Sequence, residues 1–268
     1  MRSTRRNAVP SLDKWFSPAR MGRFSFSKNP EKLYVWNTRL SKAFLEDIQH
    51  LEVLLRNRID EAMTAHYGDS WMTNIVLYAP SGGSRSPGYD RPYSRNIDKA
   101  RRRAGGVSAT KGKIIAELSF DHWRFLLNPA KEQHIWRYLR LKLPHYDVHR
   151  KPRQLFEDAV DDVLKLRNRC AHHEPLARRH LSDERAYFVE AVSTIEQLAR
   201  WIDPEASAWI QKNSRVRKLW LARPVDSVRD DLWIRRNPIG RTYYEAYSCR
   251  GPKPRKTPPP PPEENTRA

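Results

Sequence analysis

The stretch LKLRNRCAHHEPL, residues 164–176, places an arginine, Arg167, five positions before a histidine, His172. An imidazole exchanges protons near neutral pH, and a guanidinium can form paired hydrogen bonds with a phosphate group. The two side chains could therefore act on a phosphodiester, with His172 as general base or acid and Arg167 as the phosphate clamp. RNA would bring its own nucleophile, the 2′-hydroxyl, so this chemistry needs no metal ion.

The segment 152–173 is predicted to form the helix that carries these residues. On a helical wheel Arg167 falls near the middle of the apolar stripe of this helix. A charged side chain in that position must be paired or must face something other than the core. Two interpretations stay open from the residues alone. Either Arg167 and His172 form a site, or Arg167 pairs with Asp162 or Glu174 and His172 caps the helix.

The helix is expected to end at the two histidines. Pro175 disfavours helical geometry at the residue before it, Glu174. His172 and His173 should therefore lie in the last turn, where the backbone can swing a ring toward Arg167.

Charge and composition bound the class of protein. The 268 residues carry a formal net charge of +19, and the mean hydropathy is -0.82. Such an excess favours a polyanionic partner, with a generally basic surface as the alternative. The basic N-terminus has no apolar signal region, and no apolar run reaches membrane-spanning length, so the chain is expected to be cytoplasmic with no membrane contact. The two cysteines, Cys170 and Cys249, exclude a disulfide framework and a four-cysteine metal site, and no metal or cofactor is predicted.

Helical spacing of apolar residues dominates the chain, and convincing period-two alternation is absent, which predicts an all-α, multi-helix bundle. An irregular basic N-terminal arm is expected over residues 1–28. A single all-α domain follows over 29–225, then a poorly defined segment over 226–248. The last part, 249–268, is expected to be a disordered Pro-rich tail.

Three helices have sequence signals at their ends. The first long helix is expected to start after Asn29 and to stop at Gly68, with a break near Ser41. A second is expected to start near Ser108 or Thr110 and to run to Asn128. A third is expected to be capped by Ser182.

A basic cluster in residues 95–113 could follow an RNA backbone. A solvated helix face is the alternative interpretation of the same residues. The candidate RNA-binding residues are Arg101, Arg102, Arg103, Lys111 and Lys113, together with Arg169 beside the motif.

The pattern at the motif resembles the Abi-like (abortive infection) family of the HEPN superfamily, actinobacterial type. The superfamily motif is an arginine, usually followed by a polar residue, with a histidine a few positions later. Arg167, Asn168 and His172 fit this motif.

The resemblance extends along the chain. Residues 34–71, 111–127 and 201–216 resemble helices of the family and occur in the same order. One departure is Asp121, since the family usually has glycine at that position.

The resemblance implies an all-α, metal-independent endoribonuclease that acts as a homodimer in phage defence or as a toxin. The arginine and histidine of both copies would meet in one cleft, and the products would carry 2′,3′-cyclic phosphate and 5′-hydroxyl ends. Arg167 would stabilise the phosphate charge, His172 would move the proton, and Asn168 would orient Arg167 or a phosphate oxygen, with a plain polar flank as the alternative. His173 and Glu174 would be accessory. Two alternatives are a non-catalytic RNA-binding or regulatory HEPN module and a toxin silenced by an antitoxin protein.

Overall fold

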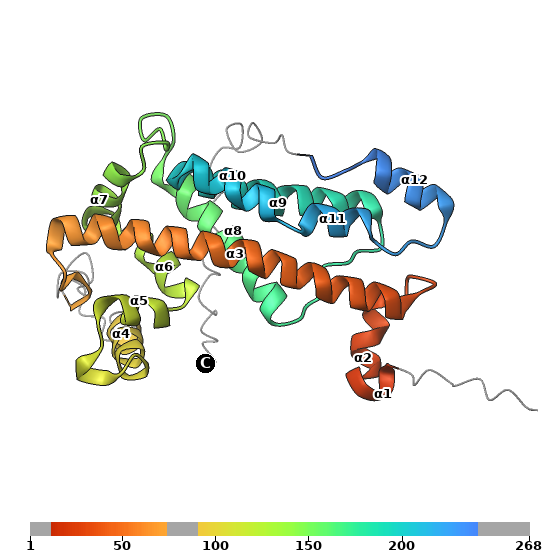
Figure 1. The fold of residues 1–268 in the computed structure, drawn as a ribbon, viewed down its shortest axis with the longest axis horizontal. Coiled ribbons are helices and arrows are strands. Elements are labelled where there is room, and N and C mark those ends of the chain that lie inside the picture. The colour runs from red at the N-terminus through yellow and green to blue at the C-terminus, as the bar shows by residue number, and fades with distance from the viewer. Residues whose placement is uncertain (1–11, 74–90, 241–268) are drawn as a thin grey trace, which may run out of the picture.

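The computed structural model describes residues 12–73 and 91–240 of the chain (Figure 1). Every regular element in these two ranges is helical, and neither range contains a strand. The all-α prediction is therefore confirmed. The predicted Pro-rich tail, 249–268, lies outside the described residues. Within the described ranges, no helix is long and apolar enough to cross a membrane.

The longest element is α3 (Pro30–Tyr67), a continuous helix of 38 residues that runs along the molecule in Figure 1. It starts and stops where predicted, with Asn29 at its N-cap position and Gly68, at φ 76°, after its last residue. The predicted break near Ser41 is wrong. Apolar side chains are buried on both sides of this residue, and their packing stabilises the unbroken helix.

Two more long helices pack on α3 and enclose the core. These are α8 (Arg153–Ala171) and α9 (Leu181–Ile202), which also contact each other. The shorter α10 (Pro204–Asn213) lies against α9, and α11 (Val216–Leu221) lies against α3. The large side chains at the centre of this core are Phe44, Phe156, Phe188, Trp201 and Trp220.

The start of α9 differs from the prediction. Ser182 is not the cap, because the helix begins one residue earlier and has His180 at its N-cap position, without a side-chain hydrogen bond. Instead, the buried carboxylate of Glu184 accepts a hydrogen bond from the backbone N–H of Arg178 at 2.5 Å. A side chain within the helix thus fixes where the chain enters it.

The helix predicted over about residues 110–128 is divided into α5 (Lys111–Glu117) and α6 (Phe120–Leu126). The two residues between them have extended backbone. In one unbroken helix, Leu118 and Phe120 would point about 200° apart. The break allows both side chains to be buried in the same core.

The remaining central elements are short. The basic α4 (Arg91–Arg103) is followed by Gly105 and Gly106, both at positive φ. The other elements are η2 (Trp71–Thr73), η4 (Gly106–Ser108), η5 (Pro129–Lys131), the π-helical η6 (Glu132–Trp136), α7 (Arg137–Leu139) and η7 (Arg140–Lys142).

The N-terminal arm was predicted to be irregular, but its described part is helical. It forms α1 (Asp13–Phe16), α2 (Pro18–Met21) and η1 (Gly22–Phe24). The ring of Phe24 is buried. Its centre lies 5.5 Å from that of the Tyr34 ring on α3, and the two rings are nearly perpendicular. This apolar contact docks the arm on the core, which the basic composition of the arm did not indicate.

The segment predicted to be poorly defined, 226–248, is also helical in its described part. It contains α12 (Val228–Arg236), and the side chain of Ser227 caps this helix by accepting a hydrogen bond from the N–H of Asp230. Ile234 is buried in the same core as the long helices. The core therefore continues past the boundary predicted at residue 225.

Candidate active site at the end of α8

The end of α8 is closed by a pair of backbone hydrogen bonds. The N–H of His173 donates to the carbonyl oxygen of Cys170 at 3.1 Å, and the N–H of Glu174 donates to that of Arg169 at 2.9 Å. This is the Schellman motif, and it places His173, at φ 58°, in the left-handed position that glycine usually occupies. Pro175 follows, so the helix stops where the sequence predicted.

Replacing His173 with glycine is expected to stabilise the fold by about 1 kcal/mol, because the left-handed conformation costs a residue with a Cβ roughly that amount. The matched control is His172→Gly, at φ −84°, where glycine should destabilise the fold by about 0.5–1 kcal/mol. The measurement is the free energy of unfolding in urea. A His173→Gly variant that is less stable than the wild type would contradict the strain at this residue.

The side chains at this turn differ in exposure. His172, His173 and Glu174 are exposed, whereas Arg167 and Asn168 are half-buried. The two imidazoles can therefore meet a substrate directly.

Cys170 is buried beneath the turn. Burial raises the pKa of its thiol to about 12, so the sulfur stays neutral and is a poor nucleophile and a poor metal ligand. Within the described residues, no group of three His, Cys, Asp or Glu side chains is placed to hold a metal ion.

A pocket of about 460 Å³, here called the α9 pocket, lies between α8 and α9 beside the turn. Asn168 and Arg169 line it from α8, His172 and Glu174 from the turn, and Tyr187 from α9. The other lining residues are Asp162, Val163, Lys165, Leu166, Glu190, Ala191 and Thr194.

Two guanidinium groups lie over the ring of Tyr187, and one of them belongs to Arg169, which also lines the α9 pocket. The guanidinium carbon of Arg169 lies 5.8 Å from the ring centre of Tyr187, and that of Arg178 lies 4.3 Å from it. Arg169 also donates to the carbonyl oxygen of Pro175 at 3.1 Å. A guanidinium beside an aromatic ring is an arrangement that binds nucleotide bases, although three carboxylates, Asp162, Glu174 and Glu190, also line this pocket. Sequence reasoning did not find Tyr187, since it lies on a different helix and no spacing connects it to the motif.

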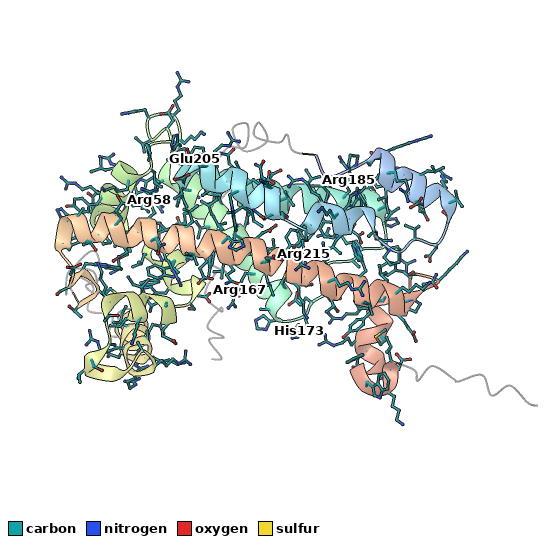
Figure 2. All side chains as sticks on the ribbon, viewed as in Figure 1. Arg58, Arg167, His173, Arg185, Glu205 and Arg215 are labelled. Atoms are coloured by element: carbon teal, nitrogen blue, oxygen red, sulfur yellow. The ribbon has the colours of Figure 1, made fainter. Side chains whose placement is uncertain are left out.

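Arg167 lies toward α3 and is not among the described residues that line the α9 pocket. Burial raises the pKa of Glu52 on α3, and the guanidinium groups of Arg167 and Arg56 oppose this rise. Arg167 is thus half-buried in the electrostatic range of a carboxylate, which accounts for a charge in the apolar stripe. Figure 2 shows Arg167 below α3 and His173 in the turn that follows α8.

The two carboxylates that the sequence suggested as partners of Arg167 have ion pairs of their own. Asp162 lies 3.3 Å from Lys165, and Glu174 lies 3.8 Å from Arg169. Sequence reasoning missed Glu52. The one local signal at Glu52 is its spacing of four residues from Arg56 on the same helix, and this spacing does not indicate that α8 lies nearby.

Asn168 connects Arg167 with His172. Its side-chain oxygen accepts a hydrogen bond from Nη1 of Arg167 at 3.2 Å. Its backbone carbonyl oxygen accepts one from the N–H of His172 at 2.8 Å. A contact that orients Arg167 is thus present, at the residue whose backbone lies one helical turn before His172.

Asp121, where the resembling family has glycine, lies in the first turn of α6. Its side chain is exposed, and its negative charge contributes to the raised pKa of Glu52. A carboxylate in the first turn of a helix is favourable. The departure therefore adds negative charge near Glu52 and leaves the residues of the motif unchanged.

The predicted basic cluster lies at the Tyr67 end of α3, where α5 meets it. The ammonium of Lys111 lies 3.2 Å from Asp60 and 2.9 Å from Asp69, so its charge is compensated and fastens α5 to α3. The side chains of Arg102, Arg103 and Lys113 are exposed, and that of Arg101 is half-buried.

Comparisons of the chain with models of known protein families, with curated proteins and with solved structures found no match. The resemblance to the Abi-like family therefore stays a prediction that rests on the motif and on the order of the resembling helices.

Proposed function

We propose that the chain is a metal-independent endoribonuclease of the HEPN type, with its site at the C-terminal end of α8. The observation that carries this proposal is the link through Asn168. This residue contacts the Arg167 guanidinium with its side chain and the His172 backbone with its carbonyl oxygen. A proton-transferring group and a phosphate-binding group are thus tied to one short piece of chain.

In the proposed reaction, His172 takes the proton of a ribose 2′-hydroxyl. The 2′-oxygen bonds to the adjacent phosphorus, and the bond from phosphorus to the 5′-oxygen of the next nucleotide breaks. A guanidinium hydrogen-bonds the phosphoryl oxygens while negative charge builds up on them. The protonated His172 then returns this proton to the leaving 5′-oxygen, which leaves a 2′,3′-cyclic phosphate and a 5′-hydroxyl.

The proposed active form is a homodimer. His172 opens into the α9 pocket, while Arg167 lies toward Glu52. In a symmetric dimer, Arg167 of one copy can meet His172 of the other, and the same contact is repeated by symmetry. Phage defence or a toxin held by an antitoxin protein is the setting that we propose on the resemblance.

The second candidate is a non-catalytic module that binds RNA. The placement of Arg167 and His172 on different sides of α8 favours it, because a single copy then offers no complete site. The basic charge of the chain serves this function equally well.

The test is cleavage of RNA by the purified protein in EDTA, with analysis of the new ends. The wild type should produce 5′-hydroxyl ends, and the double variant Arg167→Ala/His172→Ala should not. His180→Ala, which removes another exposed histidine, should cleave like the wild type. Cleavage by the double variant at the wild-type rate, or no cleavage of any RNA, refutes the nuclease. Salt-sensitive binding without products supports the second candidate.

A further inference from the structure

A second pocket, of about 350 Å³, lies on the other side of the turn that follows α8; we call it the arm pocket. Its two walls come from distant parts of the chain. His172, His173 and Glu174 form one wall, and Arg20 and Arg23 of the N-terminal arm lie in the other. Because His172 and Glu174 also line the α9 pocket, the two pockets meet at these side chains.

The arm pocket carries excess positive charge. Arg20 donates from Nη1 to the carbonyl oxygen of His173 at 3.2 Å, which fixes the arm beside the turn. Arg23 is exposed and forms no ion pair with a described residue. Glu174 is the one carboxylate among the described residues of this lining, and it already lies 3.8 Å from Arg169. An anion is the ligand that this charge favours.

Backbone strain is concentrated at the arm pocket. In the described ranges, the non-glycine residues with positive φ are Ser17, at 67°, and His173, at 58°. Both line this pocket, one from each wall. Strained residues persist where the surrounding structure holds them, and they cluster at ligand sites. The two strained residues thus mark the arm pocket as a candidate ligand site.

We propose that Arg20 and Arg23 bind a backbone phosphate of the RNA, adjacent to the phosphate on which His172 acts. This inference rests on the proposed function and makes the N-terminal arm part of the RNA site. The arm pocket and the α9 pocket lie on either side of the His172 imidazole. A ligand that occupies both pockets must be longer than a small anion, so the geometry favours a polymer. A strand that crosses His172 places a phosphate in the arm pocket and the next nucleoside against Tyr187 in the α9 pocket.

The test is binding of a short single-stranded RNA, measured with every variant in a His172→Ala background so that cleavage does not interfere. Arg23→Ala should raise the Kd about tenfold and reduce the slope of log K against log salt by about 0.7, the value for one phosphate contact on a single strand. Arg23→Lys keeps the charge and should keep the slope. Arg236→Ala, which removes an exposed arginine on α12, should change neither quantity.

An Arg23→Ala variant that binds RNA like its parent overturns the inference, even if the wild type cleaves RNA. Binding that depends on Arg23 without any cleavage by the wild type supports the arm pocket and removes the nuclease. If no variant binds RNA, both proposals are wrong. Inorganic phosphate that binds as tightly as the RNA would assign the pocket to a small anion and overturn the RNA assignment.

Discussion

Replacing His172 with alanine is expected to lower the rate of RNA cleavage by about 100- to 10,000-fold, the usual contribution of one positioned acid or base. The fold should tolerate this change. His172 is exposed, and the hydrogen bond that it makes at the helix end comes from its backbone N–H. The rate is measured in EDTA with enzyme in excess over a labelled RNA, so that product release does not contribute. An equal loss in His180→Ala would show that the assay responds to any missing histidine.

Mixing two inactive variants shows whether the cleft is shared. If Arg167 of one copy serves His172 of the other, a mixed dimer of Arg167→Ala and His172→Ala has one complete site and one empty site. After exchange of subunits, half of the dimers are mixed, and roughly a quarter of the wild-type activity should return. If both residues act within one copy, mixing restores nothing, and a dimeric cleft is excluded.

Replacing Glu184 with alanine is expected to destabilise the fold by about 3–5 kcal/mol, because it leaves a buried guanidinium without its counter-charge. Glu184 is fully buried, and its two carboxylate oxygens accept hydrogen bonds from Arg223, one of them from Nη2 at 3.3 Å. Burial raises the pKa of Glu184, and Arg223 opposes this rise. The free energy of unfolding in urea is the quantity to measure.

The matched control removes both charges. In Glu184→Leu/Arg223→Leu no ion is left uncompensated, so the double variant should be more stable than Glu184→Ala alone. A Glu184→Ala variant that unfolds at the wild-type urea concentration would show that water or another group takes over the contact to Arg223.

Local sequence signals predicted the ends of the long helix α3 better than they predicted where a helix is interrupted. Asn29 and Gly68 marked both ends of α3 correctly, because caps and glycine stops act within one turn. The break at Leu118 was missed and the break near Ser41 was wrongly predicted. Both outcomes depend on which side chains the core can bury. Residues that are distant in the chain decide this, because they form the rest of the core.

The same division applies to the candidate site. Pro175 correctly indicated that the helix ends at the histidines, because its effect on the preceding residue is local. The placement of Arg167 near Glu52, and of the arm beside His173, depends on packing between segments far apart in sequence. No periodicity in the sequence could show either contact.

The contacts of α3 set an order of events during synthesis. Trp36 donates to the carbonyl oxygen of Leu219 at 2.7 Å, and the buried Asn37 accepts from the N–H groups of Leu176 and Ala177 at 2.7 and 3.0 Å. A ribosome adds about 5–20 residues per second, so roughly 10–40 s separate the emergence of Trp36 from that of Leu219. For part of that time the apolar stripe of α3 lacks the helices that cover it, and exposed apolar surface of this kind is prone to aggregation. The proposed nuclease would also stay unfinished, and therefore harmless to its own messenger RNA, until most of it had been translated.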